Sequence, residues 1–421
     1  RIYREYVAIL KEELQPAMGC TEPIAVAYCA ALARQTLGAL PETVEVLASA
    51  NIIKNVKSVI VPNTNGQRGI AAAAAAGIVA DNADAQLQVL AKLTPEQVES
   101  VGTYLEQAAF TVGRSDKDYV FDIQVRVTAG TDSAFVEIAG FHTNVIRMEK
   151  NGVVLQHKDY QESAGQHTTD RSLLTVENIV AFANEVEIAD VQEILQRQID
   201  YNWAIAEEGL RGDYGANIGR ILLQSYGTSV HNRAKAYAAA GSDARMNGCD
   251  LPVVINSGSG NQGLTASLPV MIYAKELDVT QEMLYRALAV SNLITIHLKT
   301  GIGSLSAYCG ATAAGCGAAA GVTYLYGGQF REIAHTVVNA IAIASGMICD
   351  GAKASCAAKI ASAVEAGLLG MQMQMHESQF YGGDGIVVKG VENTIRNIGT
   401  LASEGMRETD RTIIRMMIQE H

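Results

Sequence analysis

The run CGATAAGCGAAAG, residues 309–321, consists entirely of small residues and contains two cysteines. It lies within a longer segment, residues 304–325, that has the composition of a helix. Small side chains let helix backbones approach one another closely. The run therefore predicts close helix-on-helix packing in this part of the chain.

The same bias toward small residues extends over the whole chain. Of its 421 residues, 39 are glycine, 48 % are hydrophobic and only 6 % are aromatic. The core is therefore expected to be built largely from Ala, Val, Ile and Leu. At roughly 100–200 residues per domain, the length suggests two or three domains with ample core.

The order of local patterns divides the chain into two parts. Residues 1–170 are predicted to form an α+β domain that carries a mixed sheet and a helix start next to Cys20. Residues 171–421 are predicted to form a mainly α-helical domain, with Gly-rich loops at helix N-termini that form the functional site. The segments with strand composition are 43–50, 57–61, 119–127, 134–139 and 144–148, with Asn151-Gly152 as a hairpin turn. The helical segments of the second part are 174–186, 190–209, 215–225, 230–240, 280–300, 304–325, 330–346, 353–370 and 389–419.

Four of the seven cysteines lie near the C-terminal end, at Cys309, Cys316, Cys349 and Cys356. Thiolates are soft metal ligands, so the group suggests a metal or iron–sulfur site. Seven cysteines at scattered spacing do not resemble a disulfide framework, which favours a reducing cytoplasm. Alternatively, these are ordinary buried cysteines in a small-residue core, because free cysteine is among the most buried residue types.

The spacing of these cysteines restricts how many can bind one group. Seven residues of straight helix rise about 10 Å, so only one of Cys309 and Cys316 is expected to be a ligand. Cys349 and Cys356 are also seven apart, but Asp350-Gly351-Ala352 can break a helix between them. Three thiolates on a four-iron cluster would leave one iron open to substrate.

A fifth cysteine, Cys20, lies just before a predicted helix that Thr21 would cap. The positive end of a helix dipole favours a thiolate, and such a thiolate is a competent general base. The alternative interpretation is a small buried residue at a helix entry.

A Gly-rich loop provides the strongest candidate for substrate binding. It follows a strand-like segment and opens a helix, so its free N–H groups could bind a carboxylate or a phosphate. Residues 59–70 repeat the pattern more weakly, with Asn63 and Arg68 as polar candidates. The substrate-binding candidates in the loop are Ser257, Gly258, Ser259, Gly260, Asn261 and Gln262.

Charge and hydropathy exclude several kinds of partner. The net charge of −12 argues against nucleic acid and against an anionic membrane surface. The longest apolar stretch, residues 337–349, is too short to span a bilayer. No secretion signal is recognisable at the start of the sequence, so we expect a cytoplasmic protein.

Five motifs together resemble the L-cysteine desulfidase family, and the second half of the chain is similar to the alpha domain of iron–sulfur L-serine dehydratases. The resemblance covers essentially the whole chain. The motifs are GCTEPIA at 19–25, SDARM at 242–246, NSGSGNQG at 256–263, SGMICDGA at 345–352 and GDGIV at 383–387.

The resemblance implies an enzyme with a 4Fe–4S cluster that performs β-elimination on cysteine without pyridoxal phosphate. By position it implies Cys309, Cys349 and Cys356 as cluster ligands and Cys20 as the base. Cys316 is an additional thiol close to Cys309 in sequence, and its ability to replace Cys309 stays open. We further expect a homodimer that acts on a small amino acid.

Three other functions fit parts of the sequence. A deaminase of the L-serine dehydratase type would use the same residues, because cysteine and serine differ by one atom. A pyridoxal-phosphate lyase could use Lys299 or Lys353 for a Schiff base, but it leaves the cysteines unexplained. A non-catalytic amino-acid-binding protein would keep the Gly-rich loop and bind no iron.

Overall fold

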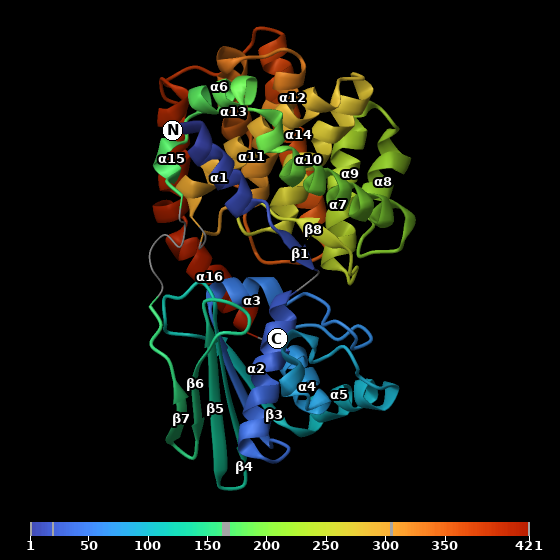
Figure 1. Cartoon of the computed structure of the whole chain (residues 1–421), viewed down its shortest axis with the longest axis vertical. Helices are drawn as coiled ribbons and strands as arrows, with labels where there is room; N and C mark the ends of the chain where they lie inside the picture. Colours follow the sequence, from blue (N-terminus) through green and yellow to red (C-terminus); the bar gives the residue numbers. More distant parts are fainter. Residues whose placement is uncertain (1, 19–20, 162–168, 304–305, 420–421) are drawn as a thin grey trace. The chain divides into compact units, whose positions relative to one another are not determined.

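A computed structural model describes residues 2–18, 21–161, 169–303 and 306–419 of the chain (Figure 1). The chain divides into two compact units. The helical unit comprises residues 1–19, 167–349 and 354–409, and the sheet unit comprises residues 20–166, 350–353 and 410–421. The predicted fold class, an α+β first part followed by a mainly helical part, is confirmed.

The units differ from the predicted domains at both ends of the chain. The first helix, α1 (Ile2–Glu13), belongs to the helical unit because its apolar face packs there. The ring of Tyr6 lies 5.4 Å from that of Phe182, and its hydroxyl donates to the Leu173 carbonyl. The last helix, α16 (Arg407–Ile418), begins in the helical unit and continues in the sheet unit, where Lys54 forms an ion pair with Asp410.

Helices dominate the helical unit. After α1 come the short strand β1 (Pro16–Met18) and its antiparallel partner β8 (Pro252–Val254). The helices are α6 (Val176–Glu185), α7 (Gln192–Arg211), α8 (Ile218–Tyr226), α9 (Val230–Met246), α10 (Gly260–Glu276), α11 (Gln281–Ile302), α12 (Gly310–Leu325), α13 (Phe330–Ile343), α14 (Cys356–Met375) and α15 (Val391–Thr400).

Helix α12, the small-residue run of the sequence, is buried along its whole length. A Cβ atom on Gly315 would lie 2.5 Å from the Ala363 carbonyl oxygen of α14. A Cβ atom on Gly317 would lie 2.1 Å from the hydroxyl of Thr295 on α11. Real Cβ atoms do not approach other atoms so closely, so the two neighbouring helices touch the backbone of α12 directly.

The start of α12 differs from the predicted helix 304–325. The helix begins at Gly310, and Cys309 is its N-cap with extended backbone angles. Residues 307–309 are not helical because they pair with another segment: Tyr308 forms an antiparallel bridge with Ile348. This pairing places Cys309 at the end of the helix.

In its described residues, the sheet unit contains six strands in the order β3-β2-β4-β5-β6-β7. Strands β2 and β3 are parallel, and the other neighbours are antiparallel. Helix α2 (Thr21–Leu37) runs along the sheet, with α3 (Ala50–Val56), α4 (Ile70–Ala80) and α5 (Pro95–Gln107) in the same unit (Figure 1). The strands are β2 (Thr43–Ala48), β3 (Ala109–Arg114), β4 (Asp122–Ala129), β5 (Asp132–Ala139), β6 (Val145–Lys150) and β7 (Val153–His157).

Local sequence signals explain most of this sheet. The predicted turn at Asn151-Gly152 joins β6 and β7, and both residues have the positive φ values, 51° and 79°, of a tight hairpin turn. The predicted strand at 57–61 is reduced to a single bridge between Ile60 and Arg68. The residues directly before it, 50–56, form helix α3, in which Ile52, Ile53 and Val56 are buried.

Two carboxylates are buried together where β4 and β5 pair. Asp122 is 0 % exposed and Glu137 is 2 % exposed. Burial raises the pKa of Glu137 to about 7, and the hydrogen bond with Asp122 acts in the same direction. Lys117 donates to Glu137 at 2.8 Å and acts in the opposite direction.

We predict that Gly315→Ala destabilises the helical unit by about 1–3 kcal/mol, because α12 and α14 must move apart to admit the methyl group. Thermal unfolding followed by far-ultraviolet circular dichroism should show a lower midpoint. Gly346→Ala is the matched control, since nothing lies within 4 Å of its Cβ position. Equal midpoints for the two variants would contradict the close approach.

We also predict that Glu137 makes stability fall as pH rises from about 4.5 to about 7. In that range the folded state keeps a proton on Glu137 that the unfolded state releases. The free energy of unfolding therefore decreases as the pH rises. Glu137→Gln cannot ionise and should flatten this part of the profile. Urea unfolding at pH 5 and pH 8 measures the difference, and parallel losses in both proteins would refute the role of Glu137.

Candidate functional site

Two of the predicted ligand cysteines lie on a short antiparallel ladder in the helical unit. The Cys309 N–H donates to the Met347 carbonyl at 2.9 Å, and the Cys349 N–H donates to the Ala307 carbonyl at 2.6 Å. The bridge between them pairs residue 308 with residue 348. Residues on either side of such a pair share one face, so Cys309 and Cys349 are diagonal neighbours on the same face.

Diagonal neighbours of this kind are about 7–8 Å apart between Cα atoms. Cys309, Cys349 and Cys356 are not joined in disulfides. All three are partly exposed, whereas Cys29, Cys249 and Cys316 are buried. The structure thus separates the three predicted ligands from the other described cysteines by their accessibility.

Cys356 joins the other two thiols from the start of α14. The pKa of the Cys309 thiol is raised to about 11, mainly by burial and then by negative charge on Cys349, with a smaller contribution from Cys356. Lys359, in the first turn of α14, donates to the Ile348 carbonyl at 2.8 Å, so the start of α14 lies beside the segment that carries Cys349.

Positive potential surrounds this place. Cys309 is the N-cap of α12 and Cys356 is the first residue of α14, so the positive ends of two helices meet there. The ammonium of Lys359 lowers the pKa of Cys309 and donates to the Ile348 carbonyl at 2.8 Å. Each of these features stabilises negatively charged sulfur.

Cys316 lies apart from this group, within the helix bundle. Its thiol contacts the Val337 carbonyl of α13 at 3.7 Å, and burial raises its pKa strongly. No charge on another cysteine contributes to that shift. The structure places Cys309, and not Cys316, beside Cys349 and Cys356.

The donor set fits a cluster better than a single ion. Within the part of the chain that the structure describes, no three His, Cys, Asp or Glu side chains converge tightly enough to hold one metal ion. In an iron–sulfur cluster each thiolate binds a different iron, so the sulfurs stand farther apart. Three soft thiols beside two helix N-termini suit such a group.

The Gly-rich loop forms a tight turn before α10. Asn256 and Ser259 exchange backbone hydrogen bonds at 3.1 Å, and Ser257 and Gly258 have positive φ values of 52° and 78°. The Ser259 hydroxyl accepts from the Gln262 N–H and caps α10. The Ser257 N–H donates to the Glu13 carboxylate at 2.7 Å. Ser257 and Ser259 thus have protein partners that shape the loop.

Buried amides support the loop from below. The Asn256 side chain donates to Asn292 at 3.0 Å, and Asn292 exchanges two hydrogen bonds with Gln198. Asn202 bonds both the Val254 carbonyl and the Gly263 carbonyl. Such satisfied buried networks fix the conformation of the segment that they hold.

The end of the loop reaches the thiols. A Cβ atom on Gly310 would lie 2.1 Å from the Gln262 side-chain nitrogen, so Gln262 rests on the residue that follows Cys309. Three side-chain atoms around this point are buried without a hydrogen-bond partner: Asn261 Oδ1, Gln262 Oε1 and Thr312 Oγ1. Native proteins seldom leave buried polar atoms unpaired, so these atoms make the place a candidate for ligand binding.

Sequence reasoning missed three of these residues as functional candidates. Arg245 lies against the first residue of α10, and its motif SDARM was visible in the sequence without an assigned role. Thr312 is hidden in the small-residue run. Lys359 has no motif around it, and only its position one turn after Cys356 could have pointed to it.

The other predicted residues belong to the sheet unit. Cys20 lies outside the described residues, and helix α2 begins at Thr21. The Asn63 side chain donates to the Leu90 carbonyl at 3.1 Å, and Arg68 donates to the Ser58 carbonyl at 2.9 Å. Both side chains hold their own loop in shape.

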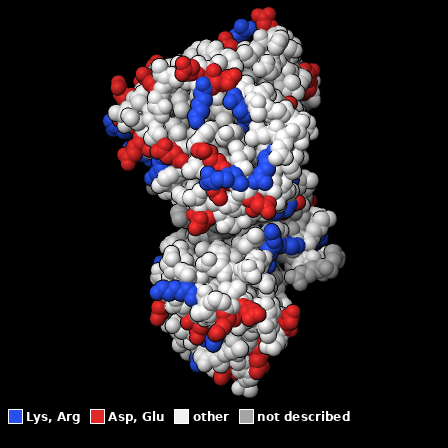
Figure 2. Space-filling view, turned by 90° about the vertical axis from the view of Figure 1, so that its right-hand side faces the viewer, with Lys and Arg blue, Asp and Glu red and all other residues white. Residues whose placement is uncertain are grey.

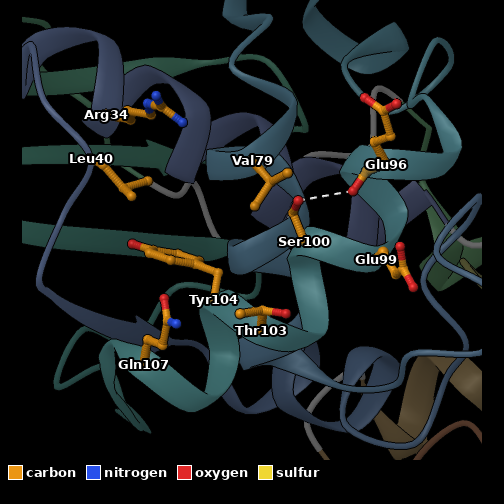
Figure 3. Close-up of a pocket in the computed structure, with 9 residues that line it drawn as sticks. All are labelled: Arg34, Leu40, Val79, Glu96, Glu99, Ser100, Thr103, Tyr104 and Gln107. Atoms are coloured by element: carbon orange, nitrogen blue, oxygen red, sulfur yellow. Dashed lines mark hydrogen bonds between the residues drawn. The ribbon is translucent and has the colours of Figure 1, made fainter.

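The sheet unit also contains a cavity of about 630 Å³ (Figure 3). Its lining includes none of the predicted site residues. Its guanidinium, Arg34, already donates to the Ile78 carbonyl at 2.6 Å and pairs with Asp81. The remaining charged groups are the carboxylates of Glu96 and Glu99, so the cavity offers no anion site.

On the face shown in Figure 2, basic side chains are scattered among acidic ones and do not gather in one patch. Among the described helices, none combines the length and apolarity that a bilayer crossing needs.

Comparison with known proteins gives consistent matches. A family model described as serine dehydratase alpha chain matches residues 84–415. A UPF0597 protein of Desulfitobacterium hafniense is 56 % identical over 420 residues, which cover 100 % of this chain and 98 % of that protein. UPF0597 proteins of Lachnoclostridium phytofermentans and Bacteroides fragilis are 49 % and 39 % identical over 99 % and 98 % of this chain, and over 100 % and 97 % of those proteins.

The placement of the thiols predicts different outcomes for two cysteine variants. Cys309→Ala should lose most of the iron that the wild-type protein takes up during anaerobic reconstitution with iron and sulfide. Cys316→Ala should keep it and lose only some stability, because it opens a small space in the core. Iron analysis and circular dichroism measure the two effects. Wild-type iron content in Cys309→Ala would show that Cys309 is not a cluster ligand.

Proposed function

Because this chain belongs to the serine dehydratase alpha-chain family, we propose that it is an iron–sulfur lyase that converts cysteine to pyruvate, ammonia and sulfide. The family supports a dehydratase-like lyase. The choice of cysteine as substrate rests on the motifs that this chain has in common with cysteine desulfidases.

One observation carries the proposal: three accessible thiols gather at two helix N-termini beside a Gly-rich loop with unpaired polar atoms. Cys309, Cys349 and Cys356 would hold a 4Fe–4S cluster. When bound, the cluster would supply a Lewis acid that polarises the departing group of the substrate. Lys359 and the helix ends would balance the negative charge of the three thiolates.

The protein residues would carry the remaining steps. The loop before α10 would bind the polar groups of the amino acid and direct its β-carbon toward the thiols. The Cys20 thiolate would take the Cα proton, and the Cα electron pair would form a double bond as the Cβ–S bond breaks. The sulfur leaves as hydrosulfide, and the aminoacrylate takes up water to give pyruvate and ammonia.

A deaminase acting on serine is the second candidate, and the description of the matching family model favours it. The same residues would serve, with hydroxide in place of hydrosulfide as leaving group. Parallel assays of pyruvate from cysteine and from serine distinguish the two. We place the enzyme in the cytoplasm, where reducing conditions preserve free thiols, and propose that it acts as a homodimer.

Anaerobic purification with iron and sulfide analysis is the direct test. We expect about four irons and four sulfides per chain, an absorption band that bleaches in air, and sulfide release from cysteine. Protein that is active without iron, or that yields a lysine adduct after borohydride treatment, would exclude the proposal in favour of pyridoxal-phosphate chemistry.

Replacing the proposed base should abolish turnover without affecting the iron content. Cys20→Ala is expected to retain wild-type iron content and to lose at least a hundredfold in kcat, because proton abstraction from Cα has no other assigned base. Cys29→Ala is the matched control, since Cys29 is buried against the sheet and its thiol contacts the Val136 carbonyl. Unchanged kcat in Cys20→Ala would remove Cys20 from the mechanism.

A further inference from the structure

The first turn of α10 combines a helix N-terminus with a guanidinium group. The turn follows the tight loop at Ser257 and Gly258, and its N–H groups form the positive end of a helix of 17 residues. Arg245 of α9 lies against it: a Cβ atom on Gly260 would be 2.1 Å from the Arg245 Nε atom. Glycine at this position is what admits the guanidinium so close to the turn. The two features together favour a carboxylate.

The unpaired oxygen atoms near this turn favour a hydrogen-bond donor instead of an anion. Gln262 is 7 % exposed, and its Oε1 atom has no hydrogen-bond partner. Asn261 Oδ1 is buried and unpaired in the same way, and Thr312, 5 % exposed, has an unpaired hydroxyl. Amide oxygens only accept hydrogen bonds, so the group that satisfies them must be a donor. An ammonium group, with three donors and no acceptor, fits this requirement.

The donor and acceptor preferences lie side by side in one chain segment. Gly260 lies against the Arg245 side chain. The Gln262 side chain, two residues later, lies against Gly310 at the start of α12. A ligand that satisfies both must carry an anion and a donor cation within a few atoms of each other. Its remaining substituent would then face the N-cap of α12, which is Cys309.

We infer that Arg245 and the first turn of α10 bind the α-carboxylate of a free α-amino acid, while the side-chain oxygens of Asn261 and Gln262 accept from its α-ammonium. This inference rests on the proposed function and sharpens it. It assigns the substrate class by two charges and leaves the β-substituent to the thiol site. Arg245 and Gln262 become specificity-determining residues with separable roles.

Three small molecules that cannot undergo the reaction test these roles by calorimetry on the holoenzyme. L-Alanine carries both charges, L-alaninamide lacks the carboxylate, and L-lactate replaces the ammonium by a hydroxyl. The wild type should bind alanine about tenfold to a hundredfold more tightly than either analogue, since a hydrogen bond to a charged group is lost in each case.

Variants of Arg245 and of Gln262 should lose selectivity between different pairs of these compounds. Arg245→Gln should remove the preference for alanine over alaninamide and keep the preference over lactate. Gln262→Leu should do the reverse. Arg233→Gln is the matched control on the same helix, because Arg233 pairs with Glu276 at the surface. In turnover assays Arg245→Gln should raise KM for cysteine by a similar factor.

Glycine variants test the same geometry without removing a charged group. Gly260→Ala should displace the Arg245 guanidinium and reproduce the selectivity of Arg245→Gln, whereas Gly310→Ala should displace the Gln262 side chain and reproduce that of Gln262→Leu. Gly346→Ala, with open space at its Cβ position, should bind all three compounds as the wild type does.

Each outcome bears on the inference separately from the proposed chemistry. Equal loss of alanine and alaninamide binding in Arg245→Gln, with normal iron content and circular dichroism, would overturn the carboxylate role. No discrimination among the three compounds by the wild type would overturn the amino-acid subsite as a whole. Iron and sulfide analysis of the same samples reports on the cluster, so failure of the lyase proposal is recognised independently.

Discussion

The direct contact of neighbouring helices with the backbone of α12 is the constraint on which the site depends. Because glycines occupy the contact points, α14 and α11 lie against the α12 backbone with no α12 side chain between them. The start of α12 then has to meet the start of α14, and each start carries a cysteine. A larger residue in the run would displace both helix ends and the thiols with them.

The Gly-rich loop, the polar part of the site, is held by hydrogen bonds between buried amides. Under the Gly-rich loop, buried amides satisfy one another, and the loop conformation follows from them. Above it, a few polar atoms are left without partners. This contrast between a fully bonded support and an unbonded surface is typical of places that bind ligands, because unpaired groups are costly where nothing binds.

Sequence patterns predicted the fold class and most element positions correctly. Cysteine spacing left Cys309 and Cys316 as alternatives, and only the resemblance to a known family favoured Cys309. The patterns located the hairpin turn at Asn151-Gly152, where backbone conformation and residue type are tightly coupled. They failed where tertiary pairing competes with local preference: residues 307–309 read as helix but pair with 347–349. They could not give Arg245 a role, because its nearness to Gly260 depends on how α9 and α10 pack.

The order in which the chain is made has a consequence for its folding. Helix α1 is synthesised before the described sheet region 21–161, whereas its packing partners Leu173 and Phe182 follow that region. At about 5–20 residues per second, the ribosome needs roughly 10–30 seconds to supply them. During that time α1 lacks both of these packing partners, while residues 20–166 of the sheet unit are synthesised ahead of them. Helix α1 therefore completes its packing only after the middle of the chain has been translated.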